Sequence, residues 1–328
     1  MRLINRLAAG LGCILFGLSP ISNAADVDNY PDKPIKIVVA FSAGGGIDIL
    51  ARTVGEELGK DWDTSVVVEN KPGGSGNIGT AYAARSKPDG YTQLMSVSTM
   101  VMTPSFMEDV GFDPVEGFEP VTQVAMGYLA FVAKPDFEGS TVQEAIELAQ
   151  KSPGALNYGS PGPGTPHHLA MELLRQKADF DAVHVPYKGS AELVRGVLAG
   201  QVDFAFLPVH QALELSRAEK IKMFSAGGTE RTQATPDVPS LSEATGIEDI
   251  DVDMWYALFL PKGAPQEIVN KLNAEVANIL EKEEVIERLQ AVGLAPVTST
   301  PEELADLTQK DLERWAEVID AAGIRPGS

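Results

Sequence analysis

Three short segments of this 328-residue chain combine glycine with hydroxyl or amide side chains and contain no Asp or Glu: residues 42–46 (SAGGG), 72–77 (PGGSGN) and 160–165 (SPGPGT). A fourth acid-free segment, residues 185–190 (VPYKGS), adds a cation and a hydroxyl. Glycine lets a ligand approach the backbone closely, and N–H groups at a helix start attract anions. Tight strand-to-helix turns also favour Gly and Ser, so any one segment alone has an ordinary structural explanation.

The balance of charge favours the binding interpretation for the four segments together. The chain has 46 Asp and Glu residues against 26 Lys and Arg, a net charge of −20. Acid-free segments on such a chain are suited to a bound carboxylate. The same charge argues against nucleic-acid binding and keeps molecules apart, so we expect a monomer. It is also consistent with a saline habitat.

The other reactive residue types do not form a catalytic or metal-binding motif. The four histidines, His167, His168, His184 and His210, lack the spacing of a metal site, and there is no G-x-S-x-G or Walker pattern. Residues 74–79 match G-x-G-x-x-G, but they follow the second predicted strand, and Asp89 comes too early for a ribose-binding acid. We therefore expect no metal, no cofactor and no catalytic residue.

The N-terminal 24 residues predict a secretory signal peptide. Arg2 and Arg6 precede an apolar run at residues 7–18, and Ser22 and Ala24 supply the small residues of a cleavage site. A short membrane anchor is the alternative, but no basic stop-transfer flank follows. The only cysteine, Cys13, lies in this segment, so the mature chain has no disulfide.

Short β-branched runs alternate with amphipathic segments, which predicts α/β layering. Predicted strands cover residues 35–40, 65–69, 91–96, 121–133, 156–159, 182–185, 202–207, 221–226 and 253–260. Predicted helices cover residues 47–59, 77–86, 141–151, 166–176, 190–199, 265–282, 284–291 and 301–321. We expect one domain formed by residues 25–134 and 251–328, with residues 135–250 inserted as a second domain. The Gly-rich segments then join strands to helices in both domains.

At these loops the chain resembles the Bug-type (TctC-like) substrate receptors of tripartite tricarboxylate transporters. The matching stretches are residues 30–36 (YPDKPIK), 44–52 (GGGIDILAR), 68–79 (VENKPGGSGNIG), 164–172 (GTPHHLAME), 185–190 (VPYKGS), 200–205 (GQVDFA) and 235–241 (TPDVPSL). They follow the family's order and cover nearly all of the mature chain.

The resemblance implies a two-lobe periplasmic binding protein, a type II-like Venus flytrap with mixed sheets flanked by helices. Such a receptor binds a small organic carboxylate between its lobes and delivers it to the membrane subunits of the transporter. Two other functions stay open: a ligand sensor for a membrane signalling partner, and a carboxylate-modifying enzyme. The enzyme lacks a credible nucleophile and base in the sequence.

Carried over by position, the resemblance implies ligand contacts from both lobes. They are Ser42, Ala43, Gly46, Asp48, Gly74, Ser75, Asn77, Thr99, Ser160, Gly164, Thr165, His168, Tyr187 and Lys188. Asp48 and His168 also have structural explanations, as an acid at a helix start and as a capping or packing residue. The family usually has Pro where Ser42 and Ala43 stand. Met100 and Met102 occupy a stretch that is often more polar, which indicates either a ligand with an apolar body or ordinary core packing.

Overall fold

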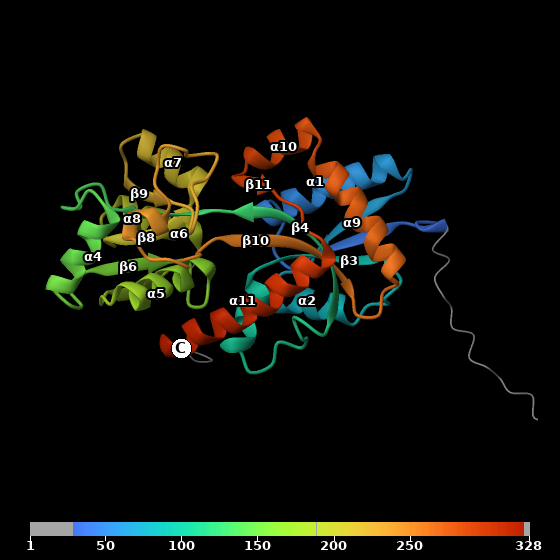
Figure 1. Ribbon diagram of the computed structural model, residues 1–328, viewed down its shortest axis with the longest axis horizontal. Coiled ribbons are helices and arrows are strands. Elements are labelled where there is room, and N and C mark those ends of the chain that lie inside the picture. Colours follow the sequence, from blue (N-terminus) through green and yellow to red (C-terminus); the bar gives the residue numbers. More distant parts are fainter. Residues whose placement is uncertain (1–28, 188, 325–328) are drawn as a thin grey trace, which may run out of the picture.

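The strands of the chain form two mixed sheets, one in each lobe. The computed structural model describes residues 29–187 and 189–324, so the predicted signal peptide and Lys188 lie outside the described residues. Within these ranges one sheet has six strands in the order β11-β4-β10-β3-β1-β2, and the other has five in the order β7-β6-β8-β5-β9. The two lobes lie side by side along the long axis (Figure 1). The predicted two-lobe α/β fold is confirmed.

The first lobe contains both ends of the described chain. Its strands are β1 (Ile35–Val39), β2 (Val66–Asn70), β3 (Thr92–Val97), β4 (Phe118–Gly127), β10 (Met254–Pro261) and β11 (Leu294–Pro296). Its helices are α1 (Gly46–Asp61), η2 (Gly74–Gly76), α2 (Asn77–Ala84), α3 (Thr99–Met102), η3 (Thr103–Ser105), α9 (Gln266–Leu280), α10 (Glu283–Gln290) and α11 (Pro301–Ala321). Strands β1 to β3 run parallel, and β10 pairs antiparallel with both β3 and β4. The apolar runs in β1 and β3 are buried, as expected for a sheet covered on both faces.

The second lobe is one continuous segment of chain. Its strands are β5 (Leu129–Ala133), β6 (Asn157–Ser160), β7 (Val183–Pro186), β8 (Phe204–Pro208) and β9 (Lys222–Ala226). Its helices are α4 (Val142–Lys151), α5 (Pro166–Ala178), α6 (Ser190–Leu198), α7 (Val209–Arg217) and α8 (Leu241–Thr245). Helix α11 of the first lobe packs against α5, so the C-terminal helix contacts both lobes.

The chain crosses between the lobes at Tyr128 and again at residues 251–253. The sequence predicted one strand over residues 121–133. This is wrong, because β4 pairs in the first sheet while β5 pairs with β8 and β9 in the second. The sheets thus place the first crossing earlier than the expected boundary at residue 134. For the described part of the chain we propose one domain of residues 29–128 with 253–324, and a second of residues 129–252.

Asp253 joins the two crossings. Its carboxylate accepts hydrogen bonds from the backbone N–H of Leu129 at 3.2 Å and of Gly228 at 2.8 Å. Burial, with a smaller contribution from the neighbouring Asp251, raises the pKa of Asp253 to about 7. A buried carboxyl therefore titrates at the hinge near neutral pH.

Local sequence signals explain several helix starts. Ser240 and Thr300 form reciprocal capping boxes with Glu243 and Glu303, at the starts of α8 and α11. Thr141 caps α4 by accepting a hydrogen bond from the Glu144 N–H, and the Glu144 carboxylate accepts one from the Ser140 N–H. No helix in the described ranges is long and apolar enough to cross a membrane.

Candidate functional site

The loop between β1 and α1 is held in shape by Asp48. Its buried carboxylate accepts hydrogen bonds from the Gly44 N–H at 2.9 Å, Arg52 Nε at 3.0 Å and Asn70 Nδ2 at 2.9 Å. Burial acts to raise the pKa of Asp48, but these hydrogen bonds outweigh it and hold the pKa below its usual value. Asp48 is therefore a structural residue that stays charged and fixes the glycine loop in front of it.

Helix α1 begins at this loop with its first N–H groups directed towards it. Gly45 is the N-cap, and no side chain of the described residues caps this end. The first turns of α5 and α6, after β6 and β7, likewise lack a side-chain cap within the described chain. Such ends carry partial positive charge and N–H donors for an anion.

The loop between β2 and α2 has a left-handed backbone, with positive φ angles at Gly73, Gly74, Ser75 and Gly76. Gly74 and Ser75 are exposed. Asn77 is buried, and its amide accepts a hydrogen bond from Thr103 Oγ1 at 2.9 Å and donates to Met107 Sδ at 3.1 Å. The Asn77 side chain thus fixes the start of α2.

Residues 98–102, after β3, combine a half-buried threonine with two buried methionines. Thr99 opens α3 and is half-buried. Met100 and Met102 are buried in the main core of the chain. Of the two interpretations of these methionines, the structure favours core packing.

The loop between β6 and α5 is stabilised by its own side chains. Ser160 is fully buried, and its Oγ contacts both the O and the N of Gly162, at 3.0 and 3.1 Å. Thr165 Oγ1 donates to the Gly162 carbonyl at 2.7 Å, and the Gly164 N–H donates to His168 Nδ1 at 3.0 Å. The side chains that are expected to contact the ligand thus also stabilise the loop.

Below this loop, His168 belongs to a stack of rings. It stacks on His184 with ring centres 4.0 Å apart, and His184 stacks on Tyr158 at 4.9 Å. The Tyr158 hydroxyl donates a hydrogen bond to Glu172, which is paired with Arg175. Burial, and then the neighbouring His184, lower the pKa of His168 to about 3. Its ring is neutral at pH 7, consistent with the packing role.

Tyr187 packs inside the second lobe. Its ring lies against Gly196 of α6 and Gly159 of β6, and its hydroxyl donates to Gln201 Oε1 at 3.4 Å. The structure therefore directs this side chain towards α6.

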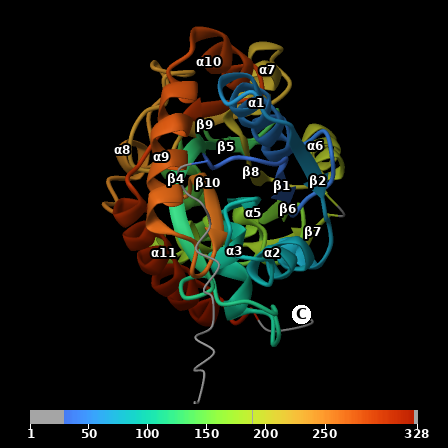
Figure 2. The same cartoon turned by 90° about the vertical axis from the view of Figure 1, so that its right-hand side faces the viewer.

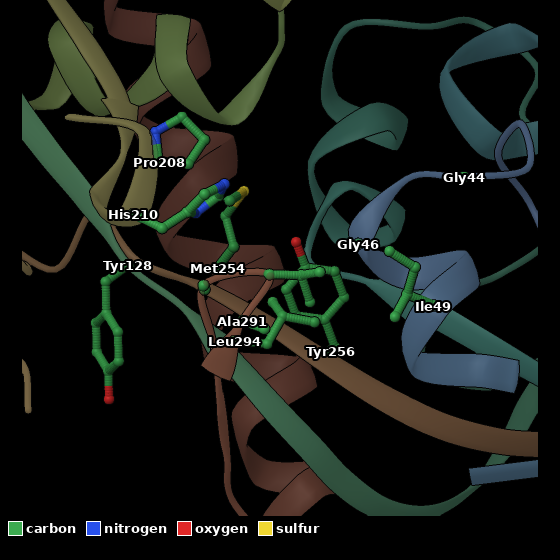
Figure 3. Close-up of a pocket in the computed structure, with 13 residues that line it drawn as sticks. Gly44, Gly46, Ile49, Tyr128, Pro208, His210, Met254, Tyr256, Ala291 and Leu294 are labelled. Atoms are coloured by element: carbon green, nitrogen blue, oxygen red, sulfur yellow. The ribbon is translucent and has the colours of Figure 1, made fainter. Parts of the chain in front are cut away.

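A cavity of about 340 Å³ lies between the lobes. Gly44 and Gly46 line it from the first loop, and Pro208 and His210 line it from the start of α7 (Figure 3). The remaining lining residues are Ile49, Gly127, Tyr128, Met254, Tyr256, Ala291, Val292, Gly293 and Leu294. Of the expected site residues, this cavity includes Gly46. Sequence reasoning missed the wall that α7 and the α10–β11 loop form. Neither segment has a Gly-rich pattern like those of the predicted loops.

Two aromatic side chains, one from each lobe, pack against a glycine of the other lobe. Phe106 of the first lobe contacts Gly164 so closely that a Cβ on Gly164 would lie 2.5 Å from Phe106 Cζ. His210 of the second lobe covers Gly293, where a Cβ would lie 2.0 Å from Nδ1. Helices α7 and α10, next to the His210 contact, lie at the top of Figure 2, whereas α3 and α5, next to the Phe106 contact, lie lower. The rings thus close the interlobe space at two separate places.

Comparison of the sequence with models of known protein families identifies the family of this chain. Residues 50–324 match the family model of the tripartite tricarboxylate transporter family receptor, TctC. The chain belongs to the TctC family.

Relatives of known sequence match over almost the whole chain. A protein of Pseudomonas sp. strain P51, described as a UPF0065 protein in the tcbD-tcbE intergenic region, is 32% identical over 96% of this chain and 93% of its own length. Protein BugT of Bordetella pertussis is 29% identical, covering 98% of this chain and 99% of its own. The predicted Bug-type identity is confirmed.

Solved structures agree with this TctC assignment. The periplasmic binding protein BugD has a TM-score of 0.74 and 29% identity, covering 90% of this chain and all of its own. R. palustris Rpa4515, solved with adipate, has a TM-score of 0.77 and 29% identity, covering 91% of this chain and all of its own. The TctC chain is a solute-binding receptor and not an enzyme, as predicted.

One pair of side chains in this TctC receptor has the geometry of a nucleophile and its base. Ser160 Oγ lies 2.7 Å from His184 Nε2. However, Ser160 has no exposed surface, and its hydroxyl is engaged by Gly162. A substrate carbonyl cannot reach such an oxygen, so the pair stabilises the loop. The described residues contain no cluster of His, Cys, Asp or Glu suited to a metal ion.

Proposed function

We propose that this receptor binds a small organic carboxylate between its lobes. The observation that carries the proposal is the start of α1, which lacks a side-chain cap among the described residues and whose first residue, Gly46, lines the interlobe cavity together with Gly44 of the preceding loop. Backbone N–H groups at a helix start are ready-made donors for a carboxylate. Two solved relatives support this ligand class, one with adipate and one, MatC of Rhodopseudomonas palustris, with malate.

Gly46 offers a sharp test of the anion site. A Cβ at Gly46 would meet Leu294 Cδ1 at 3.8 Å, an ordinary contact, and its φ is not positive. Gly46→Asp therefore fits the backbone, and an acid in the first turn suits the helix dipole. It places a negative charge beside the carboxylate. We expect it to weaken binding at least about tenfold, or ~1.4 kcal/mol, without loss of stability.

The measurement is a thermal-shift screen over mono-, di- and tricarboxylates, followed by calorimetric titration of the hits. Gly46→Asn is the matched control, since it has the same size without the charge. Equal affinities for the Asp and Asn variants would place the anion elsewhere. Turnover of a bound acid, detected by mass spectrometry, would contradict a receptor function.

We further propose that the receptor acts as a monomer in the periplasm and delivers its ligand to the membrane subunits of a tripartite tricarboxylate transporter. The family description and the predicted signal peptide support this proposal. Deleting the gene is expected to abolish uptake of the labelled ligand. Wild-type protein should restore uptake, and Gly46→Asp should not. Uptake that persists without the receptor would point to a sensor function.

A further inference from the structure

A second cavity opens next to the first between the lobes. Its volume is about 890 Å³, and it shares Tyr128, His210, Gly293 and Leu294 with the smaller cavity. His210 rests on Gly293 at this shared wall, so the two spaces meet around its ring. The smaller cavity lies at the low end of the size range of small-molecule sites, whereas the second has room for a much larger body.

About half of the described residues that line the second cavity are aliphatic, and the others include the polar Thr232, Gln233 and Gln290. Leu213 lines it from α7, Leu280 from α9, Ile286 from α10, and Leu294, Pro296 and Val297 from β11 and the following residue. Because α7 belongs to one lobe and α9, α10 and β11 to the other, an occupant contacts both lobes. Burying each further methylene of a ligand against such walls is favourable.

The charged groups at this second cavity disfavour an anion there. Glu230 and Glu281 line it and are exposed. Arg231 also lines it, but its guanidinium is paired with Glu243 at 2.7 Å and donates to the Pro236 carbonyl. No helix start like that of α1 contributes Gly-rich backbone to the described lining. The smaller cavity thus suits the carboxylate, and the larger one suits an uncharged chain or ring.

From these two adjoining cavities we infer that the preferred ligand is a monocarboxylate with an extended apolar body. Its carboxylate lies at the start of α1, and its apolar body passes His210 into the aliphatic cavity. This inference rests on the proposed function and narrows its ligand class. It also separates this receptor from relatives solved with the short dicarboxylates adipate and malate.

The experiment compares straight-chain acids by calorimetric titration: butanoate, hexanoate, octanoate and octanedioate. We expect affinity to rise up to about fourfold for each added methylene that is buried, the equivalent of ~0.8 kcal/mol. Octanoate and octanedioate have the same number of carbons and differ in the second carboxylate. Octanoate is therefore expected to bind at least about tenfold more tightly than octanedioate, because Glu230 and Glu281 repel the second charge.

Leu213→Asp tests whether the alkyl chain of the ligand lies in the second cavity. It is expected to weaken octanoate binding at least about tenfold more than butanoate binding, since it places a charge in the aliphatic wall. Leu198→Asp, the same change at an exposed leucine of α6 outside both cavities, should alter neither affinity. Ile286→Asp repeats the test from the opposite lobe, in case the α7 variant unfolds.

The outcomes separate the two proposals. Binding of short acids with no gain for octanoate, or a preference for octanedioate, overturns the apolar-body inference and leaves the carboxylate receptor intact. Equal losses for octanoate and butanoate in Leu213→Asp overturn it as well. If no acid in the series or in the wider screen binds, the proposed function fails, and the inference fails with it.

Discussion

Ser160, Asn77 and His168 show how far residue types alone define a binding loop. The sequence predicted these loops because Gly-rich turns at helix starts have a recognisable composition, and Gly44 and Gly46 of the first loop line the cavity. It could not indicate the direction of the side chains. All three form hydrogen bonds within the loops or their supports. Backbone N–H groups at the start of α1 border the cavity, beside the side chains of Tyr128, His210 and Tyr256.

Asp253 leads to a prediction about pH at the residue scale. Its pKa in the folded chain is about 7, against an ordinary 3.8, so the folded state holds the proton more tightly than the unfolded state. The stability that the folded state gains by binding this proton is fully present below pH 4 and is lost as pH rises to 7. Asp253→Asn abolishes the titration. From pH 4 to 7 we expect the variant to gain stability relative to wild type, by an amount on the order of 4 kcal/mol.

Urea denaturation of both proteins at pH 4.5, 6 and 8 measures this change. The comparison between the two proteins removes the opposite trend of carboxylates such as Asp48 and Glu57, whose pKa values are lowered. The loss of one backbone hydrogen-bond acceptor in the variant shifts its stability equally at each pH. A difference between the proteins that does not vary with pH would show that Asp253 is charged throughout.

At the scale of elements, most strands and helices followed from local patterns, and two failures have separate causes. The run over residues 121–133 is apolar throughout, and nothing local shows that β4 and β5 pair in different sheets. Helix α7 was missed because Val209 and Ala212 are its only buried residues in the described chain. His210 in its first turn forms part of the cavity wall, so the missed helix also explains why this wall of the site was missed.

The contact of Phe106 with Gly164 joins η3 to the β6–α5 loop across the lobes. Phe106→Ala removes the ring from this contact, so the closed arrangement loses buried apolar area. We expect ligand affinity to fall about three- to thirtyfold and the mean separation of the lobes to increase. Phe112→Ala, which removes a partly buried ring of the first lobe alone, is the control.

The separation of the lobes can be measured with spin labels on two introduced cysteines. Labelling is specific because the sequence has no cysteine after Cys13. Spin labels at Glu214 of α7 and Glu287 of α10, both exposed, report the distance across the cleft. An unchanged distance distribution in Phe106→Ala would show that this contact does not hold the lobes together.

The net charge of −20 acts at the scale of the whole molecule. Like charges repel one another more strongly in the compact state than in the unfolded chain, and salt screens them within about 10 Å at 0.1 M. We expect the melting temperature to rise by several degrees between about 0.02 and 1 M NaCl. Differential scanning fluorimetry across this range, with sucrose as a non-ionic control, measures the effect. A flat response would mean that the surface ion pairs already balance the repulsion.

The position of β10 has a consequence for the order in which the chain folds. This strand lies between β3 and β4 in the first sheet, yet it follows the whole second lobe in sequence. The first lobe therefore cannot pair β10 with β3 and β4 until residues up to 261 are present, and its sheet is complete only with β11 at residues 294–296. Pairings between such distant segments close slowly. A new chain of this topology therefore stays unfolded for longer. An unfolded chain can be translocated across a membrane, whereas a folded one cannot pass a narrow channel.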